Sequence, residues 1–141
     1  MSRILAIDYG TKRTGIAVSD PAQIIATGLS TIPTNTLMSF LDDYIARENV
    51  STIVIGEARQ MDNSDSESMQ YIRPFFEKLS KHFPLCNVVM FDERFTSKMA
   101  VRAMIDGGMK QKDRRNKAML DKISATILLQ SYMVFQQNKQ S

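Results

Sequence analysis

Length, composition and charge place this chain among ordinary folded proteins. It has 141 residues, of which 43% are hydrophobic and 23% charged, which is typical of one soluble globular domain, expected over residues 1–141. No apolar run approaches the ~20 residues that a membrane span needs, and Asp8 interrupts the first apolar run too early for a signal peptide. A single cysteine, Cys86, excludes an internal disulfide and favours the reducing cytoplasm.

The first third of the chain predicts three strands joined by short turns. Residues 4–8 (ILAID) and 15–20 (GIAVSD) are apolar segments of strand length. The residues between them, 9–14, are too few for a parallel crossover, so the two strands are expected to pair antiparallel. A weaker third strand is expected over 24–32 and ends at Pro33.

Helices and strands then alternate. The apolar spacing over residues 37–45 predicts an amphipathic helix, and residues 52–56 (TIVIG) predict a buried strand. Ser64 and Glu67 form a pattern that caps a helix N-terminus, and Pro74 predicts a kink or a restart of the helix that follows. The remaining predicted elements are a strand over 87–93, a short helix between Thr96 or Ser97 and residues 106–108, and a last helix over 117–137.

This order of elements predicts a mixed five-stranded sheet with helices on both faces. Short early hairpins and right-handed helical crossovers favour the spatial order 3-2-1-4-5, which is the ribonuclease H-like, three-layer α/β arrangement. The first, fourth and fifth strands are then parallel, and their carboxyl ends emerge at one edge. Binding sites of open α/β sheets lie at such edges.

Acidic residues stand at the carboxyl ends of these parallel strands. Asp8 ends the first strand, Glu57 follows the fourth, and Asp92 and Glu93 end the fifth. Neighbouring strands are ~4.8 Å apart, so the carboxylates are expected to converge, which is unfavourable without a cation. Mg2+ and Mn2+ prefer carboxylate oxygens, and one of them is the expected cofactor.

Asp121, in the last predicted helix, is a further candidate. The small residues Ser124 and Ala125 would let this helix approach the sheet, so that Asp121 reaches the same edge. The alternative is a surface acid that pairs with Lys117 at i−4. Two ions held by such carboxylates are suited to phosphodiester hydrolysis. Each acid taken singly is also typical of a turn or a solvated surface, and for Glu57, Asp92 and Asp121 that interpretation is favoured. The metal hypothesis therefore depends on their convergence.

Basic residues are concentrated in one part of the chain. Residues 1–93 carry 8 basic and 12 acidic side chains, whereas residues 94–122 carry 9 basic and 3 acidic ones. Such a concentration favours a polyanionic partner, here structured RNA or branched DNA, although a solvated surface would have the same composition. Lys12 and Arg13, beside Asp8, could hold phosphates or form an exposed basic turn. The other candidate nucleic-acid contacts are Arg94, Thr96, Lys110, Lys112, Arg114, Arg115 and Lys117.

Four segments resemble the YqgF (RuvX) family of Holliday junction resolvases, which is also linked to maturation of the small-subunit ribosomal RNA precursor. They are LAIDYGTKRTGIAVSD (5–20), MD (61–62), FDERFTS (91–97) and LDKISATILLQSY (120–132), and the resemblance covers essentially the whole chain. It implies an RNase H-like fold and a metal-dependent nuclease. The implied residues are Asp8, Glu93 and Asp121 as the acidic triad, Gly10, Lys12, Arg13 and Gly15 in the first loop, and Arg94 and Thr96 after the fifth strand.

One region departs from the family pattern. Where the family commonly has Gly-Leu-Pro followed by Met-Asp-Gly, this chain reads GEARQMDNSD (56–65). The related RuvC resolvases take an acid from the fourth strand, so Glu57 is an open candidate for an additional ligand, as is Asp92.

Other functions stay open at this point. One histidine and one cysteine exclude a zinc site and a Ser/His or Cys/His nucleophile system. A nucleic-acid-binding assembly or recombination factor without turnover would share the basic composition. DYGT (8–11) also resembles the first phosphate loop of actin-like ATPases, which need two such domains. Two oligomeric states stay open, a monomer and a homodimer. A junction nuclease has to cut two symmetric strands and is therefore expected to be a homodimer, whereas a monomer would favour the RNA substrate.

Overall fold

The structure, a computed structural model, describes residues 1–57, 67, 69–92 and 117–140. Each of the five predicted strands is present, with ends that differ from the prediction by at most two residues. The capping pair at Ser64, the short helix after Thr96 and the residue Glu93 lie outside the described residues. The elements are β1 (Arg3–Asp8), β2 (Arg13–Ser19), β3 (Ala26–Pro33), η1 (Thr34–Thr36), α1 (Leu37–Arg47), β4 (Val50–Glu57), α2 (Met69–His82), β5 (Asn87–Asp92) and α5 (Lys117–Gln140).

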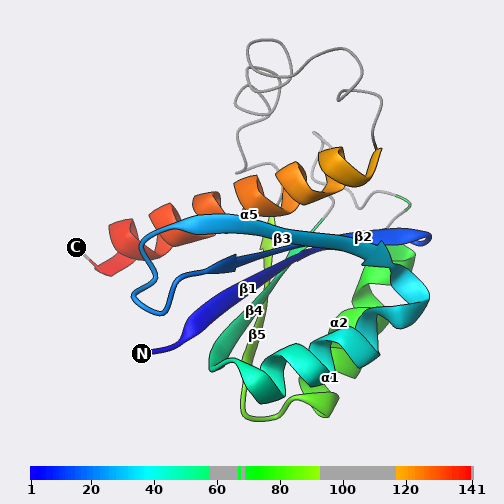
Figure 1. Cartoon of the computed structure of the whole chain (residues 1–141), viewed down its shortest axis with the longest axis horizontal. Coiled ribbons are helices and arrows are strands. Elements are labelled where there is room, and N and C mark those ends of the chain that lie inside the picture. Colours follow the sequence, from blue (N-terminus) through cyan, green and yellow to red (C-terminus); the bar gives the residue numbers. More distant parts are fainter. Residues whose placement is uncertain (58–66, 68, 93–116, 141) are drawn as a thin grey trace.

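The sheet has the predicted topology. Its strand order is β3-β2-β1-β4-β5, with β1–β2 and β2–β3 antiparallel and β1–β4 and β4–β5 parallel. Helix α5 crosses one face of the sheet, and α1 and α2 cover the other (Figure 1). The predicted three layers are therefore confirmed, and the carboxyl ends of β1, β4 and β5 lie at one edge.

Of the two outcomes expected at Pro74, a kink or a restart, helix α2 excludes the restart. It runs as a single element from Met69 to His82 with Pro74 inside it, so the helix does not restart there. Proline at this position removes the hydrogen bond to the carbonyl oxygen of Gln70, an exposed residue near the first turn. Met69 before the lost bond and Phe75 and Leu79 after it are buried in one cluster with strand residues, which keeps the helix packed on either side of the bond.

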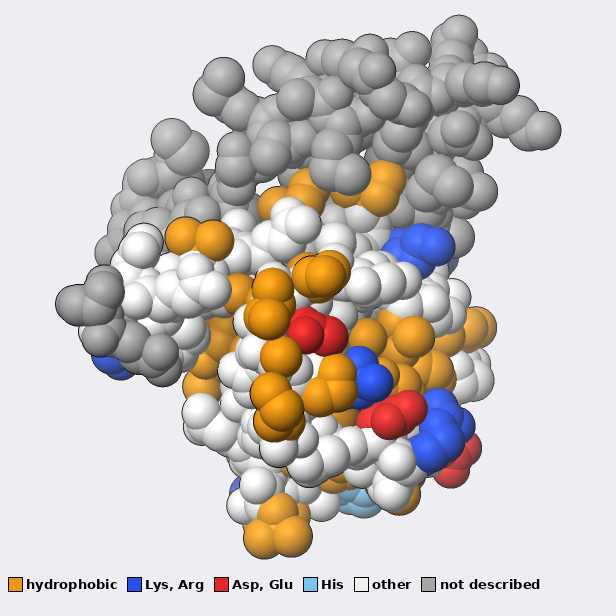
Figure 2. Space-filling model, turned by 60° about the vertical axis from the view of Figure 1, so that its left-hand side comes forward, with side chains coloured by type: hydrophobic (Ala, Val, Ile, Leu, Met, Phe, Trp, Pro, Cys, Tyr) orange, Lys and Arg blue, Asp and Glu red, His pale blue; other side chains and the backbone are white. Residues whose placement is uncertain are grey.

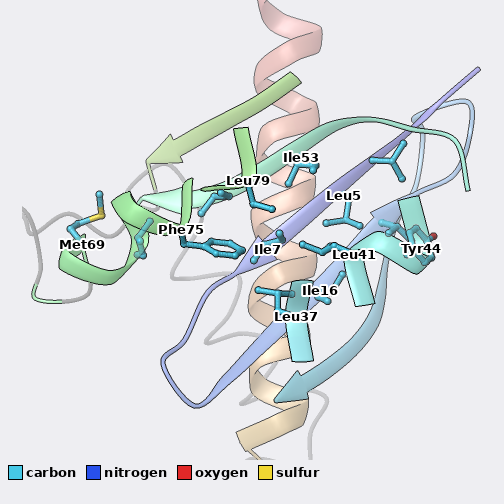
Figure 3. Packing of buried hydrophobic residues seen from close by; sticks show 14 residues of the cluster. Leu5, Ile7, Ile16, Leu37, Leu41, Tyr44, Ile53, Met69, Phe75 and Leu79 are labelled. Atoms are coloured by element: carbon cyan, nitrogen blue, oxygen red, sulfur yellow. The ribbon is translucent and has the colours of Figure 1, made fainter. Parts of the chain in front are cut away.

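Strand alternation divides the buried side chains into two layers. Leu5 and Ile7 of β1 point to the layer formed with α1 and α2 (Figure 3), whereas Ile4 and Ala6 point to the layer under α5. Successive strand residues alternate between the two faces. The face to which a residue at the end of a strand belongs therefore follows from its buried neighbours.

Helix α5 approaches the sheet closely because small residues lie at the contact. Ala125 is fully buried, as expected, but the strands contribute too. A Cβ atom on Gly15 of β2 would overlap the carbonyl oxygen of Asp121, and one on Gly28 of β3 would lie 2.8 Å from Cγ of Lys122. In the described part of the chain, no helix is both long and apolar enough to span a bilayer.

Candidate active site

Asp8 is the last residue of β1 and lies on the α5 side of the sheet. It follows the alternation of Ile4 and Ala6, which are buried under α5, and its side chain is half-buried. Its Cα partner on β2 is Gly15. Residues directly opposite in an antiparallel pair project to the same face, with Cα atoms ~4.5–5.5 Å apart. Because Gly15 has no side chain, it leaves space next to the Asp8 carboxylate.

Asp121 in the first half of α5 packs against that space. Its backbone lies directly over Gly15, and its own Cβ would be 3.2 Å from a Cβ placed on Gly15. Gly15 thus contacts Asp8 through the sheet register and Asp121 through helix packing. The structure therefore brings two acids, 113 positions apart in the chain, to the same place on the sheet.

Arg13 is the ionic partner of Asp121. Its Nε donates to Oδ2 of Asp121 at 2.5 Å, and the two side chains are 37% and 25% exposed. Asp121 thus points toward the β1–β2 turn. The alternative pairing with Lys117 concerns a side chain outside the described part of the structure. A positive group held at this distance partly compensates the charge of a carboxylate at a crowded edge.

The β1–β2 turn (residues 9–12), which directly precedes Arg13, is held by hydrogen bonds to Thr34 of η1. Oγ1 of Thr34 donates to the carbonyl oxygen of Gly10 at 2.5 Å and lies 2.9 Å from Oγ1 of Thr14. The backbone N–H of Thr34 also donates to the carbonyl oxygen of Lys12 at 2.9 Å. Thr34 therefore holds the turn at Gly10 and Lys12 and contacts the start of β2 at Thr14. Sequence reasoning missed this residue, because a threonine after a proline carries no periodic or motif signal.

A pocket opens beside this turn. It has a volume of about 240 Å³ and is lined by Gly10, Thr11, Lys12, Arg13 and Asp121. Lys12 is exposed, so its ammonium group is accessible to a ligand in the pocket. Two cations and an acid thus face one cavity, which is the arrangement expected for holding a phosphate next to a cation site.

Glu57 and Asp92 lie together, but on the other face of the sheet. They are Cα partners at the ends of β4 and β5. Ile53 and Ile55 of β4 point to the layer of α1 and α2, and Glu57 continues that alternation. Both acids are therefore neighbours of one another and are separated from Asp8 by the sheet.

The described residues supply the kind of ligand that a hard divalent cation prefers, but they contain only two of the three predicted acids. Asp8 and Asp121 supply oxygen donors, which Mg2+ and Mn2+ prefer. No group of three or more His, Cys, Asp or Glu side chains suited to a metal occurs among the described residues. Glu93, the third acid of the predicted triad, lies outside them, as do Arg94, Thr96, Lys110, Lys112, Arg114 and Arg115. Lys117 begins α5, and its side chain is not described.

Comparison with known proteins agrees with this architecture. The family model described as "RuvX: Holliday junction resolvase" matches residues 2–134. Proteins of Bacteroides thetaiotaomicron and Porphyromonas gingivalis, both named "Putative pre-16S rRNA nuclease", are 56% and 54% identical over 133 residues, which are 94% of this chain and 96% of each relative.

A solved structure shows the same fold. It is described as T. thermophilus RuvC in complex with Holliday junction substrate, and it matches with a TM-score of 0.53 and 11% sequence identity over 96% of both chains. The predicted RNase H-like fold is therefore confirmed. The family model and the curated relatives together show that the chain belongs to the RuvX family of nucleases.

Proposed function

We propose that this chain is a metal-dependent endonuclease that hydrolyses phosphodiester bonds in structured nucleic acid, with the precursor of small-subunit ribosomal RNA as its substrate. The observation that carries the proposal is the meeting of Asp8 and Asp121 over Gly15, beside a pocket with two cations. The names of the full-length relatives favour ribosomal RNA, and the family description favours a four-way DNA junction. The single domain expected over residues 1–141 would contain the whole site.

Asp8, Asp121 and Glu93 are the residues that would hold Mg2+ or Mn2+. When bound, the cation would supply a nucleophilic water and stabilise charge on the leaving oxygen. Arg13 keeps Asp121 oriented toward the turn, and Lys12 binds a phosphate next to the scissile bond. The cations between residues 110 and 117 would contact the backbone of the substrate.

The decisive experiment compares the wild type with Asp8→Asn on a precursor ribosomal RNA fragment and on a four-way DNA junction. Both are assayed with Mn2+, with Mg2+ and with chelator. We expect the variant to bind as the wild type does and to lose cleavage, because an amide keeps the shape of the side chain but not its charge. Asp43→Asn on α1 is the matched control, since Asp43 is exposed and α1 covers the opposite face.

Each outcome separates a named alternative. Cleavage by Asp8→Asn at the wild-type rate contradicts the catalytic assignment. Cleavage of the junction alone would replace the RNA substrate by DNA. Salt-sensitive binding that is indifferent to chelator, without cleavage in any metal, would favour the non-catalytic binding factor.

A further inference from the structure

A second pocket lies on the other side of the β1–β2 turn. It has a volume of about 360 Å³ and is lined by Tyr9, Gly10, Thr11, Glu67, Gln70 and Tyr71. Gly10 and Thr11 also line the pocket that holds Arg13 and Asp121. The turn therefore separates two adjoining cavities, and a nucleic-acid strand that occupies one can continue over the turn into the other. In Figure 1 the β1–β2 turn lies beside the N-terminal part of α2.

The two pockets differ in chemistry. The first contains Lys12 and Arg13, whereas the described lining of the second contains no cation and includes the carboxylate of Glu67. A phosphate would be repelled from the second pocket by Glu67 and attracted to the first pocket by Lys12 and Arg13. Amide and carboxylate groups such as those of Gln70 and Glu67 are, by contrast, groups that form hydrogen bonds with the edges of bases. The second pocket is thus suited to a base and the first to a phosphate.

Two aromatic rings line the second pocket. Tyr71 is 49% exposed, although the next residue of α2, Ile72, is buried in the core. Tyr9 stacks on Phe75 with ring centroids 4.4 Å apart and an interplanar angle of 24°, and Phe75 belongs to the buried layer shown in Figure 3. The ring of Tyr9 is therefore held by the core, while the ring of Tyr71 is half-exposed at the pocket, as in aromatic platforms on which unpaired bases stack.

We infer that this pocket binds one unpaired nucleobase of the substrate strand, stacked on Tyr71 and contacted at its edge by Gln70 or Glu67. The inference rests on the proposed function, because it places the neighbouring phosphate beside Lys12 and Arg13. Only an unpaired nucleotide exposes both its ring face and its pairing edge. The enzyme therefore acts at a single-stranded segment or at a nucleotide turned out of a helix, and not inside a regular duplex.

The test measures binding of oligonucleotides with 2-aminopurine at successive positions, in chelator so that nothing is cleaved. Single-stranded RNA, single-stranded DNA and duplexes of the same sequence are compared, and the two single strands distinguish the source of the base. We expect quenching of the fluorophore at one position of the single strand. We expect Tyr71→Ala to abolish this quenching and to weaken single-strand binding about tenfold, with little effect on the duplex.

Three further variants keep the result interpretable. Tyr71→Phe retains the ring and should bind within about twofold of the wild type, given that stacking requires only the aromatic face. Gln70→Ala changes an exposed side chain and should weaken single-strand binding without loss of fold. Phe135→Ala removes a ring that is 46% exposed near the far end of α5 and should leave binding unchanged.

Equal weakening of single-strand and duplex binding by Tyr71→Ala, or no weakening at all, would overturn the base pocket. These outcomes are independent of catalysis. If the wild type cuts and Tyr71→Ala binds and cuts equally well, the base pocket fails and the nuclease proposal stands. If the wild type cuts nothing in any metal, the nuclease proposal fails, and the quenching experiment still decides whether the pocket takes a base.

Discussion

Replacing Gly15 by alanine tests the contact that brings Asp8 and Asp121 together. The added Cβ would lie 2.5 Å from the carbonyl carbon of Asp121. Because α5 presents backbone there and not a flexible side chain, helix and sheet have to separate by roughly 1 Å to reach ordinary contact. Overpacking of this kind costs about 1–3 kcal/mol in the free energy of unfolding. A displacement of ~1 Å at reacting groups can lower the rate ~100-fold.

The measurements are urea unfolding and the cleavage rate of the folded protein. Gly28→Ala is the matched control, since its added Cβ would meet side-chain atoms, Cγ of Lys122 at 2.8 Å and Oγ1 of Thr126 at 2.9 Å, and not the backbone of α5. We expect Gly28→Ala to keep most of its activity. Wild-type stability and activity in Gly15→Ala would show that α5 does not pack on β2 as described. Lost stability with an unchanged rate would show that catalysis does not need Asp121 next to Asp8.

Three further predictions concern pH, packing and binding. Hydrogen bonds from the backbone N–H groups of Ile25 and Ile24 lower the pKa of the Asp20 carboxyl. The ionised carboxylate therefore stabilises the folded protein above the pKa of Asp20 in the unfolded chain, and this stabilisation is lost as the pH falls through the lower pKa of the folded protein. Asp20→Ala should therefore be less stable than the wild type near neutral pH. When urea unfolding is repeated at decreasing pH, the difference in the free energy of unfolding should shrink. Leu129→Ala, at a fully buried position of α5 that faces the sheet, should lower the free energy of unfolding by about 2–5 kcal/mol in thermal or urea unfolding, whereas an unchanged stability would contradict the packing of α5 on the sheet. Lys12→Gln should lower the slope of log affinity against log salt by about 0.7 on single strands if Lys12 binds one phosphate.

The surface of the molecule adds a feature that composition did not reveal. Figure 2 brings forward the side that carries the β2–β3 turn and shows hydrophobic side chains over this face. Ile24 and Ile25 of that turn are 71% and 62% exposed. The third predicted strand began at residue 24, but β3 begins at Ala26, because Asp20 accepts hydrogen bonds from both isoleucine N–H groups and holds them in the turn.

Much of the architecture could be predicted from local patterns. Apolar runs of strand length, helical spacing and short connections were sufficient for the strand order, because handedness and connection length leave few topologies. The position of Asp8 at the end of β1 followed from the same patterns. The resemblance of its motif to a family supplied the nuclease class, and the comparisons agree with it.

The sequence by itself thus determined the elements, their order and the edge at which acids collect. Only the tertiary structure decided which acids share a face: Asp8 and Asp121 meet over Gly15, while Glu57 lies with Asp92 on the opposite side. A shift of one residue along a strand reverses the face, so an approximate strand end leaves the outcome open. The choice of Arg13 as the partner of Asp121, 108 positions away, likewise depends on how closely a helix packs on a sheet, which no local pattern encodes.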